Sequence, residues 1–213
     1  MMKEEYVITN YCIIRNNRVW LNGNLVFEGR EDPSAFFASV YRHLDISYAK
    51  FFKMDNLCKL GFLAAEFVLR NTNFAQVYQG VDVGIILSNA SSSIDTDRNH
   101  QQSIASRDAY FPSPSVFVYT LANIVIGEIC IRHKLYGESA FFIEKDFYPK
   151  GMYTCVKQLL DDDVIKCCIM GWVEMDVKDY DAGLYFIEKQ TGHTRGIAIF
   201  EPEKLLDLYQ QRS

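Results

Sequence analysis

The stretch that decides the fold is Asp82-Val-Gly-Ile-Ile-Leu-Ser88. It is short and almost wholly apolar, which is typical of a strand buried on both faces of a sheet. Two later stretches, Ser139–Ile143 and Ile165–Val173, have the same character. Such strands belong to parallel sheets, whose faces are covered by the helices that connect the strands. The sequence therefore predicts an α/β protein with a mixed, mostly parallel sheet and helices on both faces.

Helical segments separate these strands. Between residues 55 and 69 apolar side chains recur at helical spacing, and Asp55 or Asn56 is in position to cap the N-terminus. Residues 116–133 form the most apolar helix, for which we expect Gly137 to act as the C-cap. Further helices are predicted over residues 98–107, 151–160 and 203–210.

More strands are expected near both ends of the chain. Residues 6–14 are β-branched and aromatic and predict an opening strand, followed by a hairpin or short excursion through residues 19–27. Residues 183–188 and 196–200 flank a turn signal at residues 190–193, so we expect them to form an antiparallel hairpin. With 213 residues and no internal repeat, we expect one domain spanning residues 1–213.

The composition excludes some classes of function. A net charge of −5 and the lack of any Lys/Arg cluster argue against a nucleic-acid binder, because phosphate contacts need a basic face. No segment reaches the ~20 apolar residues of a membrane span, and the first residues lack the layout of a secretory signal, so we expect a cytoplasmic protein. The 13 Tyr and 15 Phe need either a deep core or a partner to cover them.

The sequence offers no metal or cofactor motif. The six cysteines lie mostly inside apolar runs, without a Cys-x-x-Cys pair or Cys/His spacing, and we interpret them as reduced, buried side chains. Residues 161–163, three aspartates, are interpreted as a helix C-terminus followed by a solvated turn. Residues 91–97 are interpreted as a capping loop. We therefore expect no cofactor and no metal.

Several stretches, in order, resemble one known family. The most specific is Thr120-Leu-Ala-Asn-Ile-Val-Ile-Gly-Glu-Ile-Cys-Ile-Arg-His-Lys-Leu-Tyr-Gly137, and residues 52–61, 83–87, 162–174 and 182–188 add weaker matches. Together they are similar to the N-terminal half of the β-ketoacyl-acyl carrier protein synthases, which belong to the thiolase-like superfamily. The resemblance covers roughly residues 50–190. It implies half of a thiolase-like fold, and families of this kind dimerise through that half.

The resemblance also locates the position of the family's nucleophile. A condensing enzyme needs a cysteine thiolate at a helix N-terminus, directly after a strand. The matching position here falls on or next to Asp146, with Glu144 and Lys145 where small residues are expected. No cysteine lies between Cys130 and Cys155, and Cys155 falls inside the predicted helix, nine residues after Asp146.

The family's two catalytic histidines have no counterpart in this sequence. By resemblance they belong to the family's second half, and His193, in the turn near the end of the chain, reproduces neither motif. We expect His193 to be a solvent-exposed turn residue, and His100 and His133 to be surface groups on helices.

The leading hypothesis is a non-catalytic β-ketoacyl-synthase-like subunit. It would pair with an active synthase or with itself in fatty-acid, aryl-polyene or polyketide-type acyl assembly, through the apolar segment 116–143. Acyl carrier protein is a further candidate partner. Two alternatives stay open: an acyl-thioester decarboxylase or hydrolase that uses Asp146, and a self-associating scaffold without an acyl ligand.

Overall fold

The protein is built on one eight-stranded sheet, seen in a computed structural model that describes residues 5–70, 72–105, 112–191 and 194–211. The strand order is β3-β2-β1-β7-β6-β4-β5, and β8 pairs with β1 beside this path. The strands are β1 (Tyr6–Arg15), β2 (Arg18–Leu21), β3 (Asn24–Glu28), β4 (Val83–Asn89), β5 (Ser139–Ile143), β6 (Cys167–Asp176), β7 (Asp179–Lys189) and β8 (Ala198–Ile199).

The sheet is mixed, as the sequence predicts. Strand β4 pairs in parallel with β5 and with β6, and every other pairing in the described residues is antiparallel. Because β7 runs antiparallel to both β6 and β1, strands β1, β4, β5 and β6 share one direction. The carboxyl ends of these strands therefore meet at one edge of the sheet.

The expected hairpin between the last two strands is wrong. Both sides of β7 are already occupied, by β6 and by β1, so no position beside it is free. Strand β8 pairs instead with β1, where Val7 lies opposite Ile199. The expected turn at residues 190–193 falls partly outside the described residues.

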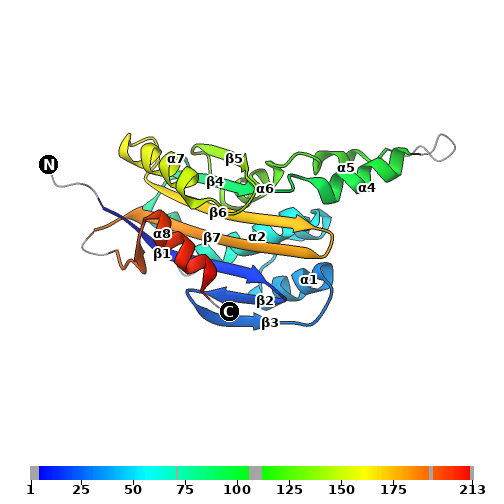
Figure 1. The fold of residues 1–213 in the computed structure, drawn as a ribbon, viewed down its shortest axis with the longest axis horizontal. Coiled ribbons are helices and arrows are strands. Elements are labelled where there is room, and N and C mark those ends of the chain that lie inside the picture. The colour runs from blue at the N-terminus through cyan, green and yellow to red at the C-terminus, as the bar shows by residue number, and fades with distance from the viewer. Residues whose placement is uncertain (1–4, 71, 106–111, 192–193, 212–213) are drawn as a thin grey trace.

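Helices cover both faces of the sheet, which confirms the predicted layers (Figure 1). They are α1 (Pro33–Leu44), α2 (Asn56–Leu69), α3 (Phe74–Val77), α4 (Ile94–Ile104), α5 (Pro114–Val118), α6 (Ile124–His133), α7 (Pro149–Asp161) and α8 (Pro202–Gln210), with the 3₁₀ turns η1 (Ala49–Lys53) and η2 (Gly80–Asp82). Helices α7 and α8 lie over one face, and α2 lies over the other (Figure 1).

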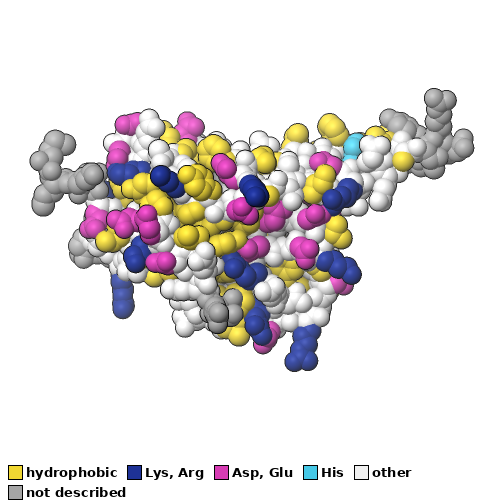
Figure 2. Space-filling view, viewed as in Figure 1, with side chains coloured by type: hydrophobic (Ala, Val, Ile, Leu, Met, Phe, Trp, Pro, Cys, Tyr) yellow, Lys and Arg dark blue, Asp and Glu magenta, His cyan; other side chains and the backbone are white. Residues whose placement is uncertain are grey.

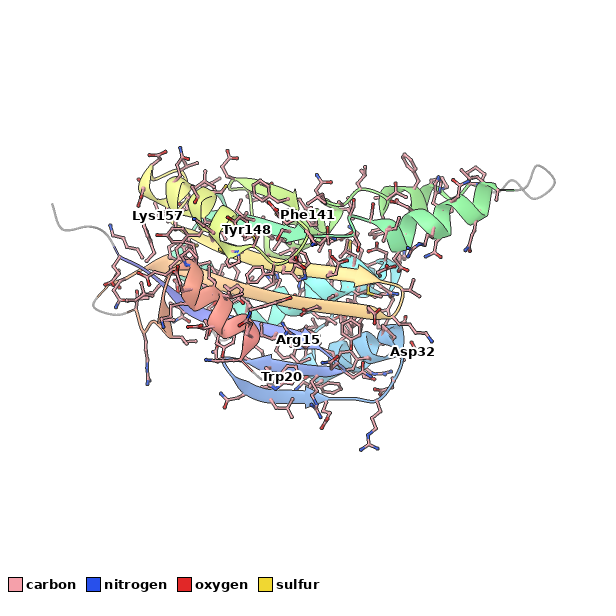
Figure 3. All side chains as sticks on the ribbon, in the orientation of Figure 1. Arg15, Trp20, Asp32, Phe141, Tyr148 and Lys157 are labelled. Carbon is pink, nitrogen blue, oxygen red and sulfur yellow. The ribbon has the colours of Figure 1, made fainter. Side chains whose placement is uncertain are left out.

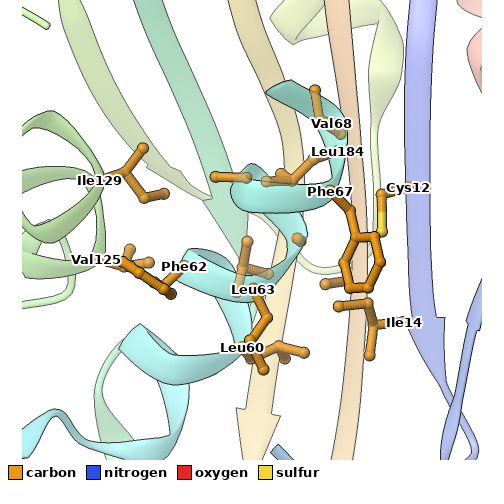
Figure 4. Packing of buried hydrophobic residues seen from close by; sticks show 14 of the residues in the cluster. Cys12, Ile14, Leu60, Phe62, Leu63, Phe67, Val68, Val125, Ile129 and Leu184 are labelled. Carbon is orange, nitrogen blue, oxygen red and sulfur yellow. The ribbon is translucent and has the colours of Figure 1, made fainter. Parts of the chain in front are cut away.

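The core follows the alternation of the strands. Cys12 and Ile14 of β1 pack against α2, together with Leu184 of β7 (Figure 4). Their neighbours Tyr11 and Ile13 point to the opposite face and pack in the cluster beneath α7 and α8. Helix α2 begins as predicted, because the Asp55 side chain accepts a hydrogen bond from the backbone N–H of Cys58.

The predicted long helix over residues 116–133 is interrupted. Helix α5 ends at Val118 and α6 begins at Ile124, so a turn separates the two. Helix α6 ends on Lys134, which adopts the left-handed conformation with φ 57°. Gly137 is therefore not the cap. It is needed for a close approach, because a Cβ atom there would lie 2.4 Å from the carbonyl oxygen of Val83.

Strand β5 also differs from its prediction as a buried strand. It lies at the end of the sheet, and its first and last residues, Ser139 and Ile143, are exposed. Its apolar composition is explained by packing of its central residues, since Phe141 contacts the cluster on the α2 side and Phe142 the cluster on the other side.

Candidate functional site

The segment between β5 and α7 is the position at which the sequence places a nucleophile. It leads from the end of β5 to Pro149, the first residue of α7. Asp146 and Lys145 lie in a bend there with exposed side chains, and Glu144 is half-buried. The backbone N–H of Glu144 donates to the carbonyl of Asn89, at 2.9 Å. The structure therefore places Glu144, Lys145 and Asp146 together directly before a helix, but leaves Asp146 open to water.

An aromatic side chain fills the interior below this bend. Phe147 is buried, and its ring lies 4.6 Å from that of Tyr209, 6.1 Å from that of Tyr185 and 6.5 Å from that of Trp172, between ring centroids. These rings come from α8, β7 and β6. Tyr148, the next residue, points outward and is half exposed (Figure 3). The space behind the bend is thus packed with rings.

None of the six cysteines has the environment of a nucleophile. A reactive thiol needs a lowered pKa, which a helix N-terminus or a neighbouring cation provides. Here burial raises the pKa of every thiol, most strongly for those in the core. Cys155 lies inside α7, as expected, and burial raises the pKa of its thiol too.

The histidines are dispersed. His43 is exposed and its ring contacts that of Phe27 at a tilted angle, and His100 lies on α4 beside Phe117. The expectation that His133 is a surface group is wrong, because its side chain is only 13% exposed. Burial lowers the pKa of His133, although Glu66, 3.4 Å away, acts in the opposite direction. His193 lies outside the described residues.

A charged cluster that the sequence analysis missed lies on the sheet next to the aromatic rings that surround Phe147. Arg15 on β1 and Asp181 on β7 are directly opposite each other, with Nη2 and Oδ1 3.1 Å apart. The Tyr209 hydroxyl of α8 donates to the other oxygen of Asp181 at 2.5 Å, and the Arg15 guanidinium lies 4.4 Å from the centre of the Tyr209 ring. Burial raises the pKa of the Asp181 carboxyl, although Arg15 and Tyr209 both act to lower it.

This cluster fixes α8 on the sheet. Tyr209 also requires Gly183 beneath it, because a Cβ atom on Gly183 would lie 2.9 Å from the Tyr209 ring. A signal was present in the sequence: Arg15 ends the apolar strand β1, and Asp181 directly precedes the buried run 182–187 of β7. Burial and the Asp181 carboxylate raise the pKa of Tyr209, so its phenol stays protonated and serves as a hydrogen-bond donor.

A depression of about 680 Å³ opens beside this cluster, at the carboxyl ends of the strands. Four carboxylates line it, those of Glu174, Asp176, Asp179 and Asp181. Two of the four already have partners outside the Arg15 cluster. Glu174 accepts hydrogen bonds from the backbone N–H groups that follow β4, the shortest 2.6 Å, and Asp176 pairs with Arg98.

Glu174 therefore holds the loop after β4, and Asp176 connects β6 to α4. In the part of the chain that the structure describes, no group of three or more His, Cys, Asp or Glu side chains is arranged to hold a metal ion. The aspartates at 161–163 end α7 and lie exposed in the following turn, as expected.

The second notable surface lies along β5 and the helices next to it. Large apolar side chains between residues 117 and 148 are exposed to solvent; they are Phe117, Val118, Leu121, Ile131, Tyr136, Ile143 and Tyr148. Figure 2 shows hydrophobic side chains spread along the upper edge of the view, where Figure 1 places α5, α6 and β5. Helices α4 and α5 project from the body at one end of this edge (Figure 1). No helix in the described residues is long and apolar enough to cross a membrane.

Comparison with known proteins identifies the fold. No protein-family model and no curated protein matches the sequence. Among solved structures, the ishigamide ketosynthase/chain length factor matches with a TM-score of 0.62 and 14% identity, over 91% of this chain and 64% of that one. A β-ketoacyl synthase from Burkholderia phymatum matches with a TM-score of 0.59 and 11% identity, over 88% of this chain and 60% of that one.

A third match is close to this chain in length. It is a chain in a ketosynthase complex with its chain length factor from Xenorhabdus doucetiae, with a TM-score of 0.57 and 12% identity, over 97% of this chain and 91% of that one. The protein therefore has a thiolase-like, ketosynthase-type fold. It spans less than two thirds of the length of the first two structures.

Proposed function

We propose that this chain is a non-catalytic, ketosynthase-like subunit that pairs with an active ketosynthase in fatty-acid or polyketide-type acyl assembly. The observation that carries the proposal is the junction between β5 and α7. An acyl-transferring ketosynthase needs a thiolate there, and this chain has an exposed Asp146 followed by the buried ring of Phe147. A carboxylate is a poor acyl acceptor in water, because the mixed anhydride that it forms hydrolyses.

The thiols elsewhere support the same view. Burial raises the pKa of all six, so none offers a thiolate at neutral pH. The nearest to the junction in sequence, Cys155, lies within α7 and not at its N-terminus.

Two features support a protein partner. Exposed apolar side chains occur at several positions along α5, α6 and β5, and exposed apolar surface is a feature of sites that bind other proteins. The similar structure from Xenorhabdus doucetiae is itself a complex of a ketosynthase with its chain length factor, and the matched chain there is nearly covered by this one. We therefore infer a role comparable to that of a chain length factor, with acyl carrier protein as a further partner.

The test is co-expression with the ketosynthase encoded nearest to this chain's gene. The two proteins are expected to elute as one complex at micromolar concentration, and acyl transfer in the complex is expected to depend on the ketosynthase's own cysteine. Separate elution of the two proteins contradicts the proposal.

A matched experiment addresses the alternative enzyme. Wild type and Asp146→Ala are incubated with malonyl- and acyl-thioesters, and thiol release and decarboxylation are followed. We expect equal background rates for the two proteins. A wild-type rate that Asp146→Ala abolishes would establish a hydrolase or decarboxylase instead.

A further inference from the structure

A cleft of about 400 Å³ lies between the start of β1, the end of β8 and helix α7. Three aromatic and three charged side chains line most of it; they are Tyr6, Tyr153, Phe200, Glu5, Lys157 and Glu201. Figure 3 labels Lys157, which lies on α7 near the start of β1. The cleft shares no residue with the junction between β5 and α7 or with the charged cluster at Arg15.

The aromatic rings of the cleft are held in fixed positions. The N–H of Phe200 donates to the carbonyl of Tyr6 at 2.9 Å, which joins the end of β8 to the start of β1, and both residues are buried. The half-buried Tyr153 ring lies 4.9 Å from the Phe200 ring, between centroids. The cleft therefore has a firm aromatic wall, and the electron-rich faces of such rings attract cations.

Two glutamates come together at the end of the same strand pair. In the register of β1 and β8, the pair of Tyr6 and Phe200 is followed outward by Glu5 and Glu201. Both glutamates are exposed, and both line the cleft. Side chains opposite each other in an antiparallel pair have Cβ atoms about 4.5–5.5 Å apart, and like charges there are destabilising. The two carboxylates therefore repel each other.

Among the described residues, no cation pairs with either glutamate. Lys157 reaches the cleft, and its Nζ lies 5.4 Å from the centre of the Tyr6 ring. However, Asp161 already neutralises this ammonium at 2.6 Å. The cleft thus combines an aromatic wall with an excess of negative charge, and this combination favours a cation carried on an apolar stem.

We propose that this cleft binds an organic cation, an ammonium or guanidinium group on an apolar stem. The charge lies between Glu5 and Glu201, where it relieves their repulsion, and the stem packs against the rings of Tyr153 and Phe200. A free amine and a lysine or arginine side chain of another protein both carry this chemistry. A divalent metal ion fits less well, because it needs about six oxygen ligands and gains nothing from apolar rings.

Titration of the full chain with butylammonium tests the proposal. In two-dimensional NMR, the backbone amides of residues 5–6, 153–157 and 199–201 are expected to shift saturably. The expected dissociation constant is on the order of 1–10 mM, because exposed cation–π contacts and ion pairs are each weak. Butanol, which lacks the charge, is the control and should cause no saturable shift. A capped lysine is titrated in parallel, and tighter binding of either cation identifies the source as a protein side chain or a free amine.

Variants assign the two parts of the site. Glu5→Gln/Glu201→Gln is expected to weaken butylammonium binding at least roughly 5-fold. Tyr153→Leu keeps an apolar side chain but removes the ring, and should weaken binding about 2- to 5-fold. Glu203→Gln is the matched control, because Glu203 is an exposed acid of α8 that does not line the cleft. It should leave binding unchanged.

The repulsion between the glutamates gives a readout without ligand. Glu5→Gln is expected to raise the midpoint of thermal unfolding, and more so at low salt. Glu5 is chosen because Glu201 directly precedes α8, whose N-terminus favours a negative charge. Saturating butylammonium should raise the midpoint of wild type but not of the double variant. The proposal is overturned if butanol shifts the same amides, if the double variant binds as tightly as wild type, or if CaCl₂ saturates the site and butylammonium does not.

Discussion

Arg15 and Asp181 lie directly opposite each other on β1 and β7, and Tyr209 reaches down from α8 to the same carboxylate. This arrangement joins the last described helix to the centre of the sheet through one charged contact. The Phe147 ring rests on Tyr209, so the contact also supports the junction between β5 and α7.

Removal of the Tyr209 hydroxyl tests the strength of this contact. Tyr209→Phe keeps the ring that packs on Phe147 and beneath the Arg15 guanidinium, but removes the donor to Asp181. Hydrogen bonds to charged groups contribute about 1.5–3 kcal/mol, and the partial exposure of Asp181 reduces that, so we expect a loss of about 1–2 kcal/mol in urea unfolding. An unchanged midpoint would mean that water replaces the hydroxyl without cost.

Truncation of Phe147 tests whether the junction is a packed core. Phe147→Ala leaves a cavity among Tyr185, Tyr209 and Trp172 and is expected to cost about 3–5 kcal/mol. Tyr148→Ala is the matched control, because Tyr148 is the next residue and is half exposed. We expect that control to stay within about 0.5 kcal/mol of wild type. Equal effects of the two variants would contradict the packing described here.

The cysteines are expected to react slowly in the folded protein. Since burial raises the pKa of each thiol, little thiolate is present at pH 8. In labelling with a maleimide followed by mass spectrometry, Cys130 and Cys155, which are the least buried, should react first, and Cys12 should react only after unfolding in urea. Fast, stoichiometric labelling of one site at pH 6 would reveal an activated thiol.

His133 should make stability depend on pH. Burial lowers its pKa in the folded state, so the unfolded chain binds more protons as pH falls through the unfolded pKa of about 6.5. Stability from this residue is therefore present above that pKa and is lost as pH falls towards the folded value. His133→Gln should show a smaller loss of stability between pH 8 and pH 5 in urea unfolding. If His133→Gln loses more stability than wild type between pH 8 and pH 5, the folded state does not lower the pKa of His133.

The open edge of β5 predicts the effect of a proline. The N–H of Ile143 faces away from β4, and its side chain is exposed, so Ile143→Pro removes a donor from the open edge only. We expect it to weaken co-purification with the ketosynthase while thermal stability changes little. Ile131→Ala, which removes an exposed side chain from α6 without changing the strand, is the comparison. If Ile131→Ala weakens binding more than Ile143→Pro does, the ketosynthase contacts α6 and not the edge of β5.

Much of the fold could be predicted from the sequence because it is encoded locally. The apolar runs of β4 and β6 and the spaced apolar residues of α2 were sufficient for the mixed sheet with helices on both faces. The pairing of β8 with β1 could not be predicted, because Val7 and Ile199 are far apart in the chain and alternation does not name a strand's neighbour. An apolar run also does not distinguish a central strand from an edge, which is why β5 was expected to be buried.

In the candidate site, too, features encoded locally could be predicted from the sequence, and features that depend on distant residues could not. The absence of a thiol near Asp146 is a property of the sequence and could be predicted directly. The filling of that space by Phe147 and the contact between Arg15 and Asp181 depend on strands and helices distant in sequence. Only the charged residues next to two apolar runs, Arg15 at the end of β1 and Asp181 before the buried run of β7, indicated the contact.

The rings around Phe147 also provide the molecule with an optical reporter. Both tryptophans, Trp20 and Trp172, are buried in the cluster beneath α7 and α8, and Trp172 lies beside Phe147. Replacing Trp20 by Phe leaves a single emitter next to the junction. Its emission wavelength then senses any rearrangement that a docking ketosynthase imposes there, without an attached dye.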